Sequence, residues 1–195
     1  MDYAPSVELP LPQALKIIIA GGFGAGKTTA VGAISEITPL STEAVMTMLS
    51  IGIDDTGQEP DKVTTTVAMD FGRVTIDEGN KLYLFGTPGQ SRFSFMWDDL
   101  SVGALGALVI VDSRRLDDCH AAVDYFEQLD LPLVVAVNAF HGELARGLDE
   151  IRWALTLRDN VPVVAFDARV TGSVRDALLV LLDQALAHSY RAYAP

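Results

Sequence analysis

The chain has 195 residues, 49% of them hydrophobic, which is typical of one domain with one core. Its formal net charge of −12 argues against wrapping nucleic acid or docking on anionic lipid, because both favour basic surfaces. A single cysteine, Cys119, excludes an internal disulfide and fits a reducing, cytoplasmic compartment. The N-terminus lacks a signal-peptide pattern, and the longest apolar stretch, residues 102–111, is too short to span a bilayer. Direct membrane insertion is therefore not expected, and any peripheral recruitment to a membrane would go through a partner.

The proline-rich residues 1–13 are expected to form a flexible arm ahead of a single domain over residues 14–192. Strand-like apolar runs and helical patterns then alternate along the chain. Buried parallel strands are predicted at residues 15–20, 82–85, 107–111, 133–137 and 161–166. Helices are predicted at residues 27–37, 93–100, 117–129, 149–157 and 173–190. Residues 67–76 and the turn at residues 77–80 predict a strand that pairs antiparallel with residues 82–85. The fold class is α/β, with a mostly parallel six-stranded sheet, one antiparallel edge strand and helices on both faces.

The stretch from Thr38 to Thr65 breaks this alternation, because it is rich in turn residues. A short helix is expected near residues 42–49. A connection of this length is usually functional or disordered. It follows the first predicted helix, where it can close over a bound phosphate.

One glycine-rich run determines the class of ligand. Residues Gly21 to Thr28 match G-x-x-x-x-G-K-[ST], the phosphate-binding loop of nucleoside triphosphatases. The glycines let successive backbone N–H groups surround phosphate oxygens. Lys27 reaches the β- and γ-phosphates, the Thr28 hydroxyl ligates Mg²⁺, and the following helix points its positive end at the phosphates. A strand before the run and a helix after it complete the arrangement that the motif requires.

The order of the motifs resembles that of the small Ras-like GTPases. After the phosphate loop come Thr64-Thr-Thr66, a hairpin, Gly86-Thr-Pro-Gly-Gln90, and a strand that ends in Asn138. The variants Thr65-Thr-Val-Ala-Met-Asp-Phe71 and Met96-Trp-Asp-Asp-Leu100 are similar to those of the bacterial conservon GTPases, which are related to the gliding-motility GTPase. This resemblance implies a Ras-like fold that binds GTP or GDP with Mg²⁺. It also implies partners of the roadblock/LC7 type and a protein similar to a sensor histidine kinase.

The resemblance assigns roles by position. Residues 38–66 and 86–100 would be the two switch regions. Thr66 would join Thr28 as a metal ligand, Gly89 would sense the γ-phosphate through its N–H, and Gln90 would orient the attacking water with Lys27 as the second catalytic residue. The nucleotide itself would contact Gly22, Phe23, Gly24, Ala25, Gly26, Lys27, Thr28, Thr29, Gly89, Asn138, Phe140, His141, Ala168 and Arg169.

The base-reading segment departs from the family pattern. The usual Asn-Lys-x-Asp is Asn138-Ala139-Phe140-His141 here. A carboxylate accepts both adjacent donors of guanine, whereas a neutral imidazole offers one acceptor and a protonated one offers none. Losing that charge-assisted pair should cost a few kcal/mol of guanine preference. Glu143, two residues further on, is a candidate to supply the missing carboxylate.

Two further departures concern catalysis. Gly86 stands where an Asp usually orients a water on Mg²⁺, a loss that typically weakens metal affinity about 10–100-fold. Phe23 is a bulky ring in a loop where glycine is common, and it would crowd an incoming arginine finger, which can be worth about 10³–10⁵ in rate. Slow intrinsic hydrolysis that needs a partner to become fast is therefore expected.

Three interpretations remain open at this point. The first is a regulatory GTPase whose two switch loops change partner binding with the bound nucleotide. The second is a pseudo-GTPase scaffold without significant turnover, which Gly86, Phe23 and the altered base motif favour. The third is another phosphate-loop enzyme, such as an ATPase.

Overall fold

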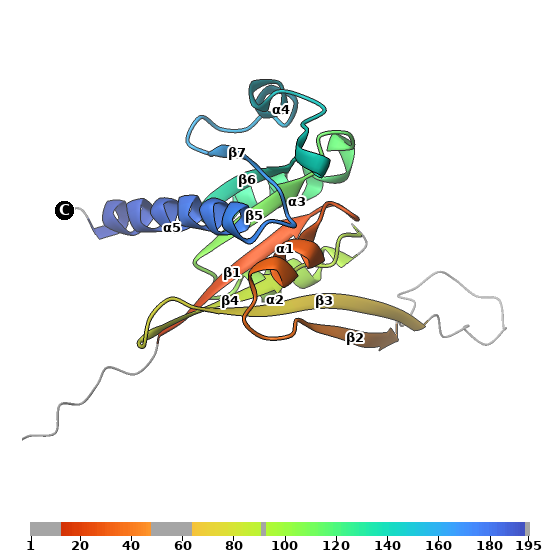
Figure 1. The fold of residues 1–195 in the computed structure, drawn as a ribbon, viewed down its shortest axis with the longest axis vertical. Helices are drawn as coiled ribbons and strands as arrows, with labels where there is room; N and C mark the ends of the chain where they lie inside the picture. The colour runs from red at the N-terminus through yellow and green to blue at the C-terminus, as the bar shows by residue number, and fades with distance from the viewer. Residues whose placement is uncertain (1–12, 48–63, 91–92, 194–195) are drawn as a thin grey trace, which may run out of the picture.

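The computed structural model describes residues 13–47, 64–90 and 93–193. Its centre is a seven-stranded sheet in the order β2-β3-β4-β1-β5-β6-β7 (Figure 1). The strands are β1 (Gln13–Gly21), β2 (Leu40–Thr47), β3 (Thr64–Thr75), β4 (Asn80–Gly86), β5 (Gly106–Val111), β6 (Leu133–Asn138) and β7 (Val163–Phe166). The helices are α1 (Lys27–Ile34), α2 (Met96–Ser101), α3 (His120–Gln128), α4 (Leu148–Ala154) and α5 (Thr171–Tyr193), with 3₁₀ turns η2 (Leu116–Asp118) and η3 (Phe140–Gly142).

The central strands form because they are apolar on both sides. Every residue of β5 and β6 is buried, as expected for parallel strands that are covered by helices on both faces. In β1 the side chains alternate, so that Ile17 and Ile19 join one core cluster while Ile18 and Ala20 join the other.

The helices fall on both faces of the sheet. Helices α1 and α5 cover one face, where α5 buries an apolar stripe at i, i+3 and i+4 spacing. Helices α2, α3 and α4 cover the other face, where Trp97 of α2 stacks on Phe126 of α3 with ring centroids 6.0 Å apart. The two cores hold the strands rigidly, so the loops at their carboxyl ends have fixed starting points.

The predicted fold class is confirmed, and all six predicted strands are present. The structure adds a seventh strand, β2, in the region expected to hold a short helix near residues 42–49. That helix is wrong for residues 42–47, which pair with β3 in antiparallel register, Val45 opposite Thr66. The antiparallel strand β3 is consequently an inner strand rather than an edge strand. The expected arm at residues 1–12 and the middle of the first expected switch region, residues 48–63, lie outside the described residues.

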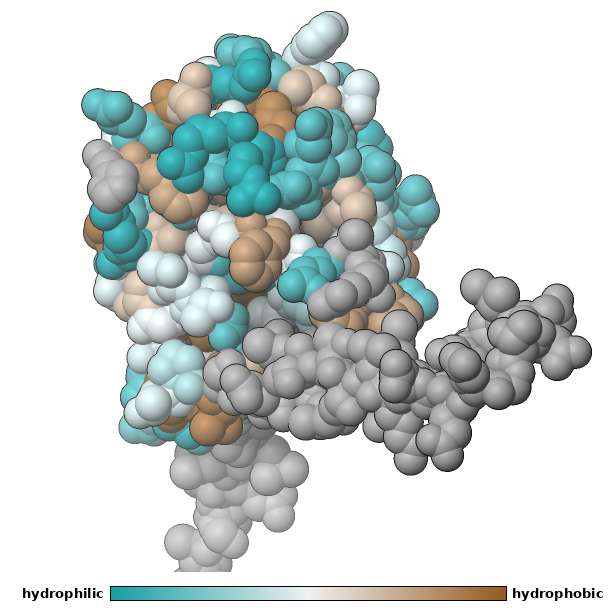
Figure 2. All heavy atoms as spheres, turned by 90° about the vertical axis from the view of Figure 1, so that its right-hand side faces the viewer, coloured by the Kyte–Doolittle hydropathy of each residue, from teal (hydrophilic) through white to brown (hydrophobic). Residues whose placement is uncertain are grey.

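The right-hand side of Figure 1 is the side toward which β1 runs, and it faces the viewer in Figure 2. Hydrophilic side chains cover much of the upper part of this face, and apolar ones lie among them in separate groups (Figure 2). Within the part of the chain that the structure describes, no helix combines the length and the apolar character needed to cross a bilayer.

Candidate nucleotide-binding site

The glycine-rich run forms the loop between β1 and α1. Gly21, Gly24 and Gly26 have positive φ angles, of 134°, 75° and 113°, which a loop with inward-pointing N–H groups requires. At Gly26 the need for glycine is also steric, because a Cβ atom would lie 2.6 Å from the side-chain nitrogen of Asn138. Gly26 is at the same time the N-cap of α1, so the helix starts at the loop and points its positive end into it.

Lys27 is buried inside this loop, with only 7% of its surface exposed. Its ammonium group donates hydrogen bonds to the carbonyl oxygens of Gly21, at 2.8 Å, and Gly22, at 2.7 Å. Burial lowers the pKa of Lys27 to about 8, and the nearby Asp70 carboxylate partly offsets this effect. A desolvated ammonium of this kind favours an anionic ligand, because a phosphate would restore the interactions that burial removes.

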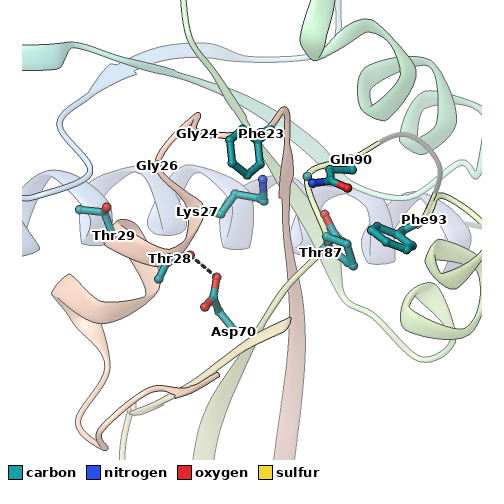
Figure 3. A pocket seen from close by; sticks show the side chains of 12 residues that line it. Phe23, Gly24, Gly26, Lys27, Thr28, Thr29, Asp70, Thr87, Gln90 and Phe93 are labelled. Carbon is teal, nitrogen blue, oxygen red and sulfur yellow. Dashed lines mark hydrogen bonds between the residues drawn. The ribbon is translucent and has the colours of Figure 1, made fainter. Parts of the chain in front are cut away.

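Asp70 of β3 supplies the carboxylate of the site. The Thr28 hydroxyl donates a hydrogen bond to Asp70 Oδ2 at 2.6 Å, as the dashed line in Figure 3 shows. Asp70 is only 8% exposed, and β-sheet pairing places it directly opposite Gly86 of β4. The hydroxyl expected to ligate Mg²⁺ therefore has a carboxylate as its neighbour.

The pairing of Asp70 with Gly86 explains why position 86 is a glycine. A Cβ atom at position 86 would lie 2.9 Å from the Asp70 Cβ and 3.1 Å from its Oδ2. A side chain at position 86 would thus overlap the carboxylate that comes from β3. A carboxylate carried by the neighbouring strand therefore lies beside position 86, where the acidic group is absent.

These residues line a cleft of about 360 Å³. The phosphate loop and Asp70 form one side, and the segment after β4 forms the other, where Gln90 faces the loop (Figure 3). Gly89 lies so close that a Cβ atom there would be 2.6 Å from the Lys27 ammonium nitrogen and 2.9 Å from the Phe23 Cα. The Thr87 hydroxyl in this lining is buried and has no hydrogen-bond partner among the described residues. An orphaned polar atom in a cleft indicates a ligand that would satisfy it.

The loops after β6 and β7 are tied to the phosphate loop. Asn138 donates a hydrogen bond from Nδ2 to the carbonyl of Ala25 at 2.9 Å, which links the end of β6 to the phosphate loop. Its Oδ1 accepts the N–H of Ala168 at 3.2 Å. Three loops expected to surround a nucleotide therefore meet at one buried amide.

The remaining predicted site residues lie around this framework. Thr29 lines the cleft and is exposed. Arg169 forms a two-pronged ion pair with Asp167, at 3.0 and 2.7 Å. Glu143 lines a separate cavity of about 280 Å³ beside Phe140 and does not line the phosphate cleft. The side chain of His141, a residue of η3, lies outside the described part of the structure.

The structure does not bring Thr66 to Thr28. Thr66 lies within β3, paired with Val45, and its side chain is outside the described part. It precedes Asp70 by four residues, which corresponds to about 13 Å along an extended strand. Among the described side chains, the hydrogen-bond partner of the Thr28 hydroxyl is Asp70.

Asp70 and Thr87 are the site residues that the sequence reasoning missed. The sequence carried one signal for Asp70, which is an acidic residue inside the apolar run Thr66-Val-Ala-Met-Asp-Phe71. Acidic residues are depleted in strands and are rarely buried without a partner, so this Asp needed an explanation. Its proximity to Thr28 depends on strand register, which the sequence did not reveal.

Comparisons with known proteins agree with this geometry. A model of the family described as "conserved hypothetical ATP binding protein" matches residues 19–188. The uncharacterized protein MJ1339 of Methanocaldococcus jannaschii is 33% identical over 126 residues, which are 64% of this chain and 69% of that protein.

Solved structures show the same fold. The G domain of the FeoB iron transporter of T. maritima superposes with a TM-score of 0.61 at 16% identity, over 89% of this chain and 99% of that one. The cytosolic domain of the same transporter in its GDP form gives a TM-score of 0.59 at 16% identity, over 89% of this chain and 64% of that one. The fold is therefore that of a GTPase G domain. Because the family model spans most of the sequence, the chain belongs to the family of conserved hypothetical ATP-binding proteins.

Proposed function

We propose that this protein is a regulatory GTPase that binds GTP and GDP with Mg²⁺, hydrolyses GTP slowly and changes partner binding with the nucleotide state. The observation that supports this proposal most is the cleft itself. A phosphate loop with a buried lysine, a hydroxyl–carboxylate pair and the Gly89-Gln90 segment converge on one space. This is the arrangement that phosphoryl transfer to water needs.

The oxygen donors present fit Mg²⁺. Hydroxyl and carboxylate oxygens are its preferred protein ligands, and the ion usually keeps several waters. Among the described residues there is no group of three or more His, Cys, Asp or Glu side chains that would form a complete metal cage. Thr28 would therefore hold the ion together with phosphate oxygens, and Asp70 would hold a water on it. Bound there, Mg²⁺ would neutralise charge on the phosphates.

Residues of this chain account for a slow reaction. Gln90, at the rim of the cleft, would orient the attacking water, and Lys27 would stabilise charge on the phosphate oxygens. No arginine is among the described residues that line the cleft, and the Phe23 ring occupies its wall. In this proposal a partner supplies the stabilising cation for fast turnover.

Two alternatives have support of their own. The family description mentions ATP, and the base-reading segment lacks the carboxylate that pairs with guanine, so an ATPase is the second candidate. The pseudo-GTPase interpretation loses one of its three arguments, because Asp70 supplies the carboxylate that Gly86 lacks. The roadblock/LC7-type and sensor-kinase-like partners remain proposals that rest on the resemblance. A cytoplasmic site of action remains a proposal that rests on the single cysteine, Cys119.

Nucleotide identity is the decisive experiment. The purified protein is denatured, the released nucleotide is identified by chromatography, and GTP, GDP and ATP are then titrated with and without Mg²⁺, with Lys27→Ala as the control. Tight binding of guanine nucleotides, lost in Lys27→Ala, supports the proposal. Preference for ATP would establish the second candidate, and guanine binding without turnover in the presence of a partner would establish the scaffold.

A further inference from the structure

The turn after β5 holds an arginine in a fixed position. The Arg114 guanidinium donates to both carboxylate oxygens of Asp112, from Nε at 2.9 Å and from Nη2 at 2.8 Å, and the Arg114 backbone N–H donates at 3.0 Å. Asp112 is only 8% exposed. The pairing with Arg114 keeps the pKa of Asp112 below its usual range, so this carboxylate stays charged. A bidentate pair on a buried carboxylate restricts the guanidinium far more than an ordinary surface ion pair does.

The guanidinium lies over the ring of Phe140, with Cζ 4.1 Å from the ring centroid. This is a cation–π contact at stacking distance. Phe140 opens η3, in the segment Asn138-Ala139-Phe140-His141 where the GTPase motif reads the base. Ala139 has no long side chain to support that segment. The arginine from the neighbouring turn places a cation against it.

The same turn has two other connections. The Ser113 hydroxyl accepts the N–H of Ala145 at 3.1 Å, which joins the turn to the far end of the base-reading loop. Asp118 of η2 lies against the phosphate loop, where a Cβ atom on Gly22 would be 2.7 Å from the Asp118 Cβ. Residues 112–118 therefore contact both loops that are expected to bind the nucleotide.

We propose that Arg114 is a positioning residue of the base site. It holds Phe140, and with it the η3 loop, against the turn after β5. It thereby takes the structural place of the lysine that is absent at position 139. This inference rests on the proposed function, because it concerns the site that would bind the base of the nucleotide. Arg114 touches the base-reading loop rather than the phosphate loop. Its removal should therefore weaken binding of the base and leave binding of the phosphates unchanged.

The test distinguishes an effect on binding of the base from an effect on binding of the phosphates. Arg114→Ala, Arg114→Lys and the control Arg146→Ala are compared, since Arg146 is also about half exposed and pairs with Glu150. Affinities for GDP, GTP and inorganic tripolyphosphate are measured with Mg²⁺, together with the nucleotide dissociation rate and Tm. Arg114→Ala should weaken GDP and GTP roughly 3- to 30-fold through faster dissociation. The GDP and GTP affinities of Arg114→Lys should lie between those of the wild type and Arg114→Ala, because lysine keeps the charge and loses the two-pronged pair. Arg146→Ala should match the wild type.

A merely structural role would give a different pattern. Equal losses for GDP and tripolyphosphate, or a Tm lowered by more than about 4 °C, would show that Arg114 supports the fold as a whole and would overturn the inference. Unchanged GDP affinity in Arg114→Ala would overturn it as well. If the wild-type protein itself bound tripolyphosphate but neither GDP nor ATP, the proposed function would be refuted, and the inference about Arg114 would be refuted with it.

Discussion

Exchanging the residues at positions 70 and 86 should move the carboxylate of the site from one strand to the next without losing it. Asp70→Gly removes the carboxylate to which the Thr28 hydroxyl donates its hydrogen bond. The loss of a group that orients a metal ligand typically lowers metal affinity about 10–100-fold, or about 1.4–2.8 kcal/mol. Asp70→Asn should show a similar loss, because it keeps the shape and removes the charge.

Gly86→Asp alone should not raise the affinity of the site for Mg²⁺. Its Cβ would lie 2.9 Å from the Asp70 Cβ, closer than such atoms normally approach, and would place a second carboxylate beside the first. The double variant Asp70→Gly/Gly86→Asp removes both the overlap and the repulsion. It should recover Mg²⁺ affinity to within about fivefold of the wild type, allowing about 0.5–1 kcal/mol for glycine in a strand.

Titration of a fluorescent GDP analogue at a series of free Mg²⁺ concentrations measures this effect. Affinity in EDTA serves as the reference, since it reports phosphate and base contacts alone. The reasoning is refuted if Asp70→Asn shows the Mg²⁺ dependence of the wild type. It is also refuted if Gly86→Asp alone binds Mg²⁺ more tightly, because the two side chains would then not compete for one place.

Three other predictions concern stability, binding and turnover. The pKa of Lys27 is lowered from 10.5 to about 8, so the ligand-free fold should gain ~3 kcal/mol as pH rises from 8 to 10.5. Burial raises the pKa of Cys119 from 9.0 to about 12, which works in the opposite direction and costs ~4 kcal/mol between pH 9 and 12. Urea unfolding of Cys119→Ala should therefore show stability rising up to pH 10.5, and a falling curve would contradict the Lys27 assignment. Gly26→Ala should abolish nucleotide binding in a fluorescence titration and cost more than about 1 kcal/mol, because the new Cβ meets Asn138 at 2.6 Å; normal binding would disprove the packing argument. Gln90→Ala should leave GTP affinity within about threefold and slow single-turnover hydrolysis about 10- to 100-fold, and an unchanged rate would remove Gln90 from the mechanism.

Much of the fold was predictable because its signals are local. The all-apolar runs of β5 and β6 predict buried parallel strands, and the stripe on α5 predicts a helix packed on the sheet. The phosphate loop was predictable because its glycines and lysine must stand at fixed spacing. The resemblance placed Asn138 at the nucleotide site, and its side chain bonds to Ala25 of the phosphate loop.

The features that escaped prediction depend on pairing between distant segments. Residues 40–47 mix polar and apolar side chains, and they form a strand because β3 offers an open edge. The contact of Asp70 with Thr28 depends on the register of β3 against β4. The contact of Arg114 with Phe140 joins two loops, and nothing local in the sequence indicates it.

Because Asp70 lies on β3, the residues that line the cleft come from two separate parts of the structure. Thr28 and Asp70 belong to a helix and a strand held in the central sheet, whereas Gly89 and Gln90 belong to the segment that follows β4. In a site whose carboxylate sits at position 86, a displacement that starts at that residue shifts the acidic group and the glutamine together. Here a rearrangement of the segment after Gly86 would leave the Asp70 carboxylate in place on β3. In the proposed GTPase, the hold on the metal and the readout of the terminal phosphate would thereby be independent of each other.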